Sequence, residues 1–299
     1  MKKNVLWMLT GLALVLAFGL VLGGCDLNND DPDPGPTPLT EAEMNEADFG
    51  PGVTPTTHTI TTKADFVAAK NAIEGGGNYV LNITVEVDVE GVYITPKAGA
   101  VVSLRGGGTL HRSTNPSNGL FELSNANSTL ILRDAGLKGH AGNDTGLVYI
   151  TDSSAEFVMH GGTITGNSGR GVEVSDGTFT MNGGTISGNT FSDSGAGGGV
   201  SVYQGTFTMT GGTISGNTTD RHGGGVWVYD GTFTKTGGTI YGGSAGTGLA
   251  NTADDTDEDG YDGHAVFWID GDSNLWKVDG DITGALSTDN VTGWTAIIP

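Results

Sequence analysis

An acidic segment near the C-terminal end has the residue types and spacing of a calcium ligand set. Asp255, Asp257 and Asp259 alternate along the chain and are followed by Gly260, which matches the front half of a D-x-D-x-D-G calcium loop. The back half does not match, because position twelve is Val266 and not the bidentate Glu of that motif. The segment therefore predicts either a Ca²⁺ site or a solvated acidic loop, and Ca²⁺ is the one cofactor that the sequence brings into consideration.

A second group of residues has the chemistry to bind a ligand through ring faces and polar groups. Its aromatic members fall on alternate positions of short apolar segments and are Tyr203, Trp227, Tyr229 and Phe267. Its polar members lie together in one loop and are Asp220, Arg221 and His222. Exposed aromatic rings beside polar groups suit stacking on a neutral sugar ring or packing against a protein partner. The alternatives are that strands simply favour aromatic residues, or that the long final loop covers the rings.

Repeats of 22–28 residues define the elements that must position these side chains. The clearest copies are GTFTMNGGTISGNT at 177–190, GTFTMTGGTISGNT at 205–218, GTFTKTGGTIYGG at 231–243 and AEFVMHGGTITGN at 155–167. The apolar anchor of the GGTI motif falls at Leu110, Leu137, Ile164, Ile186, Ile214, Ile240 and Ile282. A segment of V-x-V type precedes each Phe segment, and its anchors follow a similar spacing with the same long final step. Three short apolar alternations per period predict a coil with three strands.

Stacking of these coils predicts three ladders of like residues, of which the first two point inward. The phenylalanine ladder is Phe157, Phe179, Phe207 and Phe233, and the methionine ladder is Met159, Met181 and Met209. Lys235 occupies the fourth methionine position, and we expect it to sit at a turn and point outward. Asn167, Asn189 and Asn217 form a structural ladder with His140 in register before them, because Asn tolerates left-handed turns and can stack its amides. Seven coils about 4.8 Å apart predict a rod about 34 Å long.

The repeats resemble those of right-handed parallel β-helices, the pectate-lyase-like fold. The GGTI/GN pattern is similar to that of repeat-rich bacterial surface lipoproteins, and the resemblance covers about residues 60–295. It implies an all-β, single-stranded right-handed parallel β-helix of about seven coils with a short N-terminal capping helix. Residues 63–74, KADFVAAKNAIE, have the pattern of that helix, and the segment from Leu275 to Pro299 should close the other end.

Enzymes of the resembled fold keep their sites in a loop-walled cleft beside one strand face. Pectate lyases use clustered Asp for Ca²⁺ and an Arg or Lys as base, and polygalacturonases use paired Asp and a Gly-His-Gly motif. Here no coil aligns two or three Asp beside an Arg, and Gly263-His264 is followed by Ala265. These missing motifs favour a binding protein, and a polysaccharide lyase or glycoside hydrolase of the same fold is the alternative.

The N-terminal residues have the pattern of a secretory signal. Lys2 and Lys3 precede an apolar run over residues 5–22, which ends in Leu22-Gly23-Gly24-Cys25. This ending resembles a bacterial lipobox, in which the cysteine becomes the lipidated first residue. Cys25 is the only cysteine in the chain, so no disulfide competes for it. The alternative is an uncleaved membrane anchor, because eighteen apolar residues can just span a bilayer.

The sequence thus divides into three parts. Residues 1–24 are predicted to be a lipoprotein signal peptide, residues 25–59 a lipidated cysteine with a disordered tether, and residues 60–299 the β-helix domain. The tether is rich in Pro, Asp, Asn and Thr and poor in apolar residues, so it cannot offset its ordering entropy by burial. The membrane is a predicted partner through the lipid, and the cell envelope is the predicted location, with the outer membrane or cell surface favoured over the inner membrane.

Composition and charge exclude several classes of protein. The chain has 53 glycines in 299 residues, which argues against coiled coils and helical bundles. Its formal net charge is −21, with 13 basic residues against 34 acidic ones, so a nucleic-acid partner is not expected.

The sequence as a whole predicts a non-catalytic, lipid-anchored envelope protein that binds a glycan or a protein of a host or cell surface, in the manner of an adhesin. One alternative is an enzyme of the same fold that acts on polysaccharides. Another is a structural or antigenic surface protein without a specific ligand.

Overall fold

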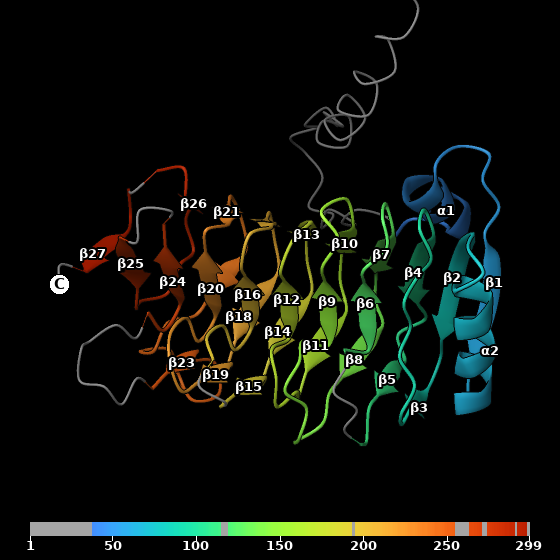
Figure 1. Ribbon diagram of the computed structural model, residues 1–299, viewed down its shortest axis with the longest axis horizontal. Coiled ribbons are helices and arrows are strands. Elements are labelled where there is room, and N and C mark those ends of the chain that lie inside the picture. Colours follow the sequence, from blue (N-terminus) through green and yellow to red (C-terminus); the bar gives the residue numbers. More distant parts are fainter. Residues whose placement is uncertain are drawn as a thin grey trace, which may run out of the picture. The chain divides into compact units, whose positions relative to one another are not determined.

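The computed structural model describes residues 38–114, 119–192, 195–254, 263–270, 274–290 and 292–297. Within the unit that begins at Glu41, the chain winds as a parallel β-solenoid of about seven turns (Figure 1). The predicted all-β solenoid is therefore confirmed. Each regular turn contributes one strand to each of three sheets.

The nine-stranded sheet contains the F-x-M strands of the repeats. In spatial order its strands are β1 (Thr56–Ile60), β2 (Asn78–Ile83), β4 (Val101–Arg105), β7 (Thr129–Leu132), β10 (Glu156–Met159), β13 (Thr178–Met181), β17 (Thr206–Met209), β21 (Thr232–Lys235) and β26 (Leu286–Ser287). All neighbours pair in parallel except β26, which runs antiparallel to β21.

The seven-stranded sheet contains the T-I strands and is parallel throughout. Its strands are β3 (Glu86–Asp88), β5 (Thr109–His111), β8 (Gly136–Lys138), β11 (Thr163–Thr165), β14 (Thr185–Ser187), β18 (Thr213–Ser215) and β22 (Thr239–Ile240).

The eight-stranded sheet contains the V-x-V strands. Its strands are β6 (Phe121–Leu123), β9 (Val148–Ile150), β12 (Val172–Val174), β16 (Val200–Val202), β20 (Val226–Tyr229), β24 (Val266–Ile269), β25 (Leu275–Val278) and β27 (Thr295–Ile297). Pairing is parallel from β6 to β24 and antiparallel for the last two strands.

A small three-stranded parallel sheet, which the three-strand period does not predict, lies in the loops that follow the T-I strands. It consists of β15 (Thr190–Phe191), β19 (Thr218–Thr219) and β23 (Thr252–Ala253). These loops differ in length from turn to turn, so this sheet orders the part of the coil where the repeats diverge.

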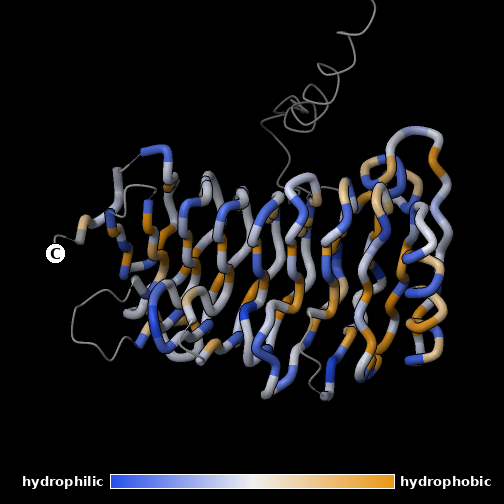
Figure 2. Tube along the Cα trace, in the orientation of Figure 1, coloured by the Kyte–Doolittle hydropathy of each residue, from blue (hydrophilic) through white to orange (hydrophobic). Residues whose placement is uncertain are grey.

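The predicted internal ladders fill the core. Successive phenylalanine rings from Phe157 to Phe233 stack with centroids 4.9, 4.8 and 5.3 Å apart, and the methionines at 159, 181 and 209 are fully buried. Because alternate residues of each strand point inward, every turn adds the same apolar side chains to one continuous core. In Figure 2, hydrophobic residues recur along successive turns.

The structure corrects the expectation that Lys235 points outward. Lys235 occupies the methionine position opposite Met209 and is 1% exposed. Its Nζ donates a hydrogen bond of 2.7 Å to the carbonyl oxygen of Gly284. Burial lowers the pKa of this amine. The lysine fits inside because the C-terminal segment closes the end of the solenoid and supplies an acceptor, a contact that the repeat does not encode.

The asparagine ladder is confirmed as structural and is longer than predicted. Its buried members are Asn143, Asn167, Asn189, Asn217 and Asn251. The Oδ1 of one asparagine accepts the backbone N–H of the preceding one, at 3.2, 3.1 and 3.0 Å along the last four members. Asn143, and not His140, continues the ladder, because its Nδ2 donates to Asn167 Oδ1 at 2.8 Å. The amides thus satisfy buried backbone groups that no strand pairs.

Both ends of the solenoid are capped, as the sequence predicts. At the N-terminal end, α2 (Lys63–Ile73) begins with a capping box between Thr62 and Asp65 and buries Phe66, Ala69 and Ile73. At the opposite end, β25, β26 and β27 pair antiparallel with the last turns, and Trp268, Trp276 and Trp294 pack together there.

The structure also corrects part of the predicted disordered tether. Within residues 25–59, α1 (Glu41–Phe49) is a helix beside β4, and β1 pairs with β2. We call the contact of Asp48 with Arg105 and Arg133 the α1 clamp. Asp48 accepts from Arg105 at 2.6 Å, from Ser103 at 2.7 Å and from Arg133. Ion pairing, and not apolar burial, therefore holds α1, which is why a composition argument misses it.

Neither helix of the described residues is long and apolar enough to cross a bilayer. The predicted signal peptide and Cys25 lie outside the described residues.

Candidate ligand-binding site

A hollow of about 440 Å³ lies outside the eight-stranded sheet, near the C-terminal turns. Three aromatic rings line it, those of Tyr203, Trp227 and Tyr229. Three nitrogen-bearing side chains also line it, those of Arg170, Arg221 and His222, and Gly195, Ala196 and Ile269 complete the described lining. We call this feature the aromatic hollow. Five of its residues belong to the predicted site.

Strand alternation places the aromatic residues on the outer face. Val226 and Val228 of β20 are fully buried in the core, so Trp227 between them points outward. Tyr203 follows β16, and Tyr229 ends β20 on the next turn. Tyr203 is 47% and Tyr229 36% exposed, which places two large rings in solvent.

The three rings form one stacked cluster that is partly exposed to solvent. Tyr203 stacks on Tyr229 with centroids 4.9 Å apart, and Trp227 stacks on Tyr229 at 5.8 Å. Tyr203 and Trp227 are tilted by 39° at 6.5 Å. The indole Nε1 of Trp227 is buried, with no hydrogen-bond acceptor among the described residues, so packing orients the ring. Such a cluster offers exposed aromatic surface to a ring-shaped ligand.

Phe267 does not belong to the exposed strip, which corrects the sequence prediction. It is 1% exposed, because β25 runs antiparallel beside β24 and sets Lys277 opposite it. The imidazole of His222 stacks on the Phe267 ring at 4.4 Å. Phe267 therefore packs against His222. His222, and not Phe267, is among the residues that line the hollow.

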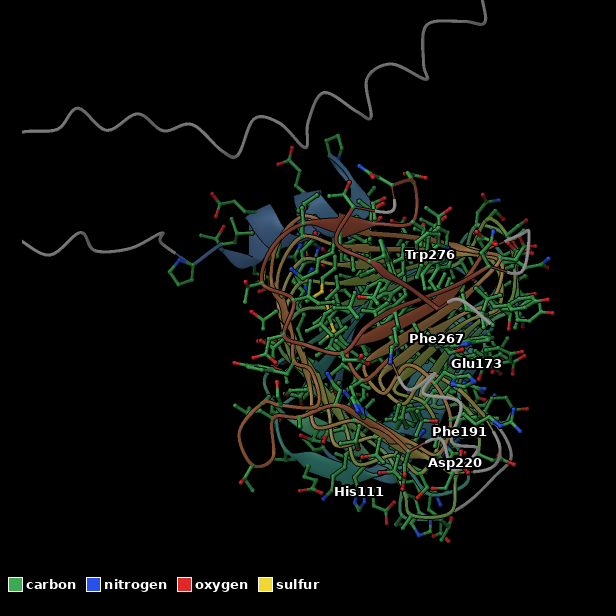
Figure 3. The ribbon with its side chains drawn as sticks, turned by 90° about the vertical axis from the view of Figure 1, so that its left-hand side faces the viewer. His111, Glu173, Phe191, Asp220, Phe267 and Trp276 are labelled. Atoms are coloured by element: carbon green, nitrogen blue, oxygen red, sulfur yellow. The ribbon has the colours of Figure 1, made fainter. Side chains whose placement is uncertain are left out.

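Arg170 is held in place from several sides. Its Nη1 lies 3.2 Å from Glu173 Oε2, its Nε donates to the carbonyl oxygen of Ala196 at 3.1 Å, and its guanidinium lies 4.0 Å from the ring centroid of Phe191. Viewed along the solenoid, Glu173, Phe191 and Phe267 fall on the same side (Figure 3). Arg170, Glu173 and Phe191 are not among the residues predicted for the site. Only loop position could have indicated Arg170, because it lies between a T-I strand and a V-x-V strand, as Arg221 does.

The loop over Phe191 requires glycine at one position. A β-carbon at Gly195 would lie 1.6 Å from Cε1 of Phe191, a separation that no side chain tolerates. The missing side chain lets this loop lie against Phe191, so that the adjoining Ala196 carbonyl accepts from Arg170.

The loop that carries the predicted polar residues is only partly directed into the hollow. Arg221 is exposed and lines the hollow, while its backbone N–H donates to Thr219 Oγ1 at 3.3 Å. The backbone N–H of Asp220 donates to the carbonyl oxygen of Phe191 at 3.3 Å. Asp220 is not among the described lining residues.

The described lining of the hollow combines aromatic rings with cationic side chains. Glycoside hydrolysis requires two facing carboxylates, and the described lining contains no Asp or Glu. Within the described residues, no group of three or more His, Cys, Asp or Glu side chains is placed to hold a metal ion. Asp255, Asp257 and Asp259, the predicted calcium ligands, lie outside the described residues.

Two other hollows lack this combination of rings and cations. One of about 310 Å³ lies beside β26 and includes Thr234 and Lys235. The other, of about 270 Å³, lies beside α1 and includes Met44 and Arg105. Neither has an aromatic residue in its described lining.

Comparisons with known proteins give no match to a protein-family model, a curated protein or a solved structure. Function must therefore be inferred from the residues of the site.

Proposed function

We propose that this protein is a non-catalytic, lipid-anchored protein of the cell envelope that binds a glycan in the aromatic hollow. The observation that carries the proposal is the cluster of Tyr203, Trp227 and Tyr229 beside Arg170 and Arg221. Sugar rings have apolar faces that stack on aromatic side chains, and their hydroxyl groups accept hydrogen bonds from guanidinium groups. The rigid solenoid holds these groups in a fixed arrangement, which limits the entropy lost on binding.

A protein partner is the second candidate. The exposed tyrosines Tyr203 and Tyr229 favour it, because tyrosine is enriched in protein interfaces. The same binding measurement separates the two candidates, since a free oligosaccharide cannot reproduce a protein interface.

The test uses the full chain in detergent on a glycan array, with Trp227→Ala as the variant. We expect Trp227→Ala to weaken glycan binding by more than about 1 kcal/mol, as a central aromatic contact does. The free energy of unfolding should change little, because an outward side chain leaves no core cavity.

Tyr149→Ala is the matched control, because Tyr149 is an aromatic residue on the same sheet, in β9, and lies outside the described lining of the hollow. It should leave binding unchanged. Absence of any glycan binder would contradict the proposal, and so would a Trp227→Ala variant that binds as tightly as the wild type.

The lipid anchor is a separate part of the proposal. A single thiol placed at a lipobox-like sequence supports acylation of Cys25, and two acyl signals are enough to hold a protein at a membrane. We expect Cys25→Ala to shift the protein from the membrane fraction to the soluble fraction. Full retention of the variant in membranes would instead assign the anchoring to residues 5–22. We place the protein at the outer membrane or the cell surface.

A further inference from the structure

The aromatic hollow contains an unusual cation. Ten of the lysines and arginines in the described residues contact a carboxylate or a backbone carbonyl oxygen. Arg221 is the exception within this part of the chain, because its guanidinium makes no hydrogen bond or ion pair there. In a chain with 34 acidic residues and 13 basic ones, a cation with neither kind of contact among the described residues stands out.

Of the two arginines that line the hollow, only Arg221 has a positive charge that no carboxylate of the described residues neutralises. Arg170, the other arginine of the hollow, is neutralised by Glu173 at 3.2 Å. The described lining contains no carboxylate that could neutralise Arg221 in the same way. The guanidinium is exposed beside the cluster of three rings, so it can reach a ligand without first losing a partner among the described residues.

The charge of the rest of the molecule limits how many anionic groups the ligand carries. The formal net charge of −21 repels a polyanion over the range of the Debye length, about 8–10 Å at physiological salt. One guanidinium binds one carboxylate in a bidentate manner. Further carboxylates along the ligand would meet the acidic surface without a matching cation.

We propose that the ligand is a largely neutral oligosaccharide with a single terminal acidic sugar, whose carboxylate binds Arg221 while its neutral sugars stack on Tyr203, Trp227 and Tyr229. This inference rests on the proposed function, because it specifies the ligand of the same hollow. Arg221 selects the ligand by charge, and the rings supply binding that is shared by acidic and neutral glycans.

The test is a glycan array of matched pairs, in which each glycan with one terminal sialic or uronic acid is compared with its neutral parent. The best pair is then titrated against the full chain in detergent. We expect the acidic member to bind about tenfold more tightly or better, as one charge-assisted hydrogen-bonded pair provides. Oligogalacturonate, which carries a carboxylate on every residue, should bind more weakly than the singly acidic glycan.

Variants of Arg221 separate charge selection from general binding. Arg221→Gln should bring the ratio between acidic and neutral partners to about one, because the amide can still donate to sugar hydroxyls but has no charge for a carboxylate. Lys138→Gln is the matched control, because it removes an exposed cation, paired with Glu86, from a strand outside the described lining. It should leave both affinities unchanged.

The outcomes distinguish the two proposals. Glycan binding with no preference for the acidic member, or with oligogalacturonate bound most tightly, overturns the single-anion inference and leaves the proposed function intact. A preference that survives Arg221→Gln also overturns it. An array with no binder overturns the proposed function itself.

Discussion

Two regions on the outside of the solenoid each contain two arginines, and the chain treats them differently. In the α1 clamp, Asp48 contacts both Arg105 and Arg133, and its side chain is 1% exposed. In the aromatic hollow, Glu173 contacts Arg170, while Arg221 remains in solvent without a carboxylate among the described residues. The first arrangement is closed by the protein's own chain, and the second is left open beside three aromatic rings.

Burial explains the difference. The side chains of Arg105 and Arg133 are 7% and 12% exposed, and a buried cation requires a partner because its desolvation costs several kcal/mol. Arg221 stays hydrated, so leaving it unpaired costs little. The α1 clamp therefore stabilises the fold, whereas the hollow retains a charge that a ligand can use.

The largest effect is expected from Asp48→Asn, which leaves two buried guanidinium groups without a carboxylate. We expect the free energy of unfolding to fall by about 3–5 kcal/mol, as for other broken buried pairs, and residues 41–49 to become sensitive to protease. Denaturant unfolding and limited proteolysis measure the two effects. Glu46→Gln, an exposed carboxylate of the same helix, is the control and should have little effect. Equal stability of Asp48→Asn and the wild type would show that α1 is held by other contacts.

The α1 clamp should also respond to acid. Burial raises the pKa of Asp48, but hydrogen bonds from Arg133, Ser103 and Arg105 outweigh it and hold the pKa below the usual value. A lowered pKa means that the carboxylate stabilises the fold above its unfolded pKa of about 3.9, and that this contribution is lost as the pH falls through the lower folded value. The stability difference between wild type and Asp48→Asn should therefore shrink between pH 5 and pH 2.5 in urea titrations. A difference that stays constant over this range would contradict the assignment.

A smaller effect is expected from Glu173→Gln, which removes the carboxylate that pairs with Arg170 in the hollow. Loss of the ion pair with Arg170, whose partners are 17% and 19% exposed, should cost about 1 kcal/mol of stability. Affinity for an acidic glycan should rise a few-fold, because Arg170 then lacks a carboxylate. Glu122→Gln is the control, since Glu122 lies in the same row of the sheet two turns away. A fall in affinity would mean that Glu173 positions Arg170 for the ligand.

The contrast between the regions also explains what could be predicted from the sequence. The repeats predicted the strands, the phenylalanine ladder and the alternation that turns Trp227 outward, because each turn contacts its neighbours through the same positions. Spacing therefore carried the information. The same reasoning brought Tyr203, Arg221, His222, Trp227 and Tyr229 into one site.

The features that were missed depend on contacts with segments that are not part of the repeat. Asp48 contacts Arg133 across 85 residues of sequence, and no period relates the two. Phe267 is buried by β25, and Lys235 finds its acceptor in Gly284. In each case a non-repeating segment from one end of the chain covers the solenoid. Composition and periodicity do not reveal such contacts.

Hydrogen–deuterium exchange with a saturating, array-selected oligosaccharide tests the glycan site most directly, because it compares the two arginine regions in one measurement. Binding in the aromatic hollow should protect the amides of residues 195–203 and 219–229 and leave residues 41–49 of the α1 clamp unchanged. The Trp227→Ala variant should lose this protection at the same glycan concentration. Protection of the α1 clamp, or of neither region, would contradict the assignment of the aromatic hollow as the binding site.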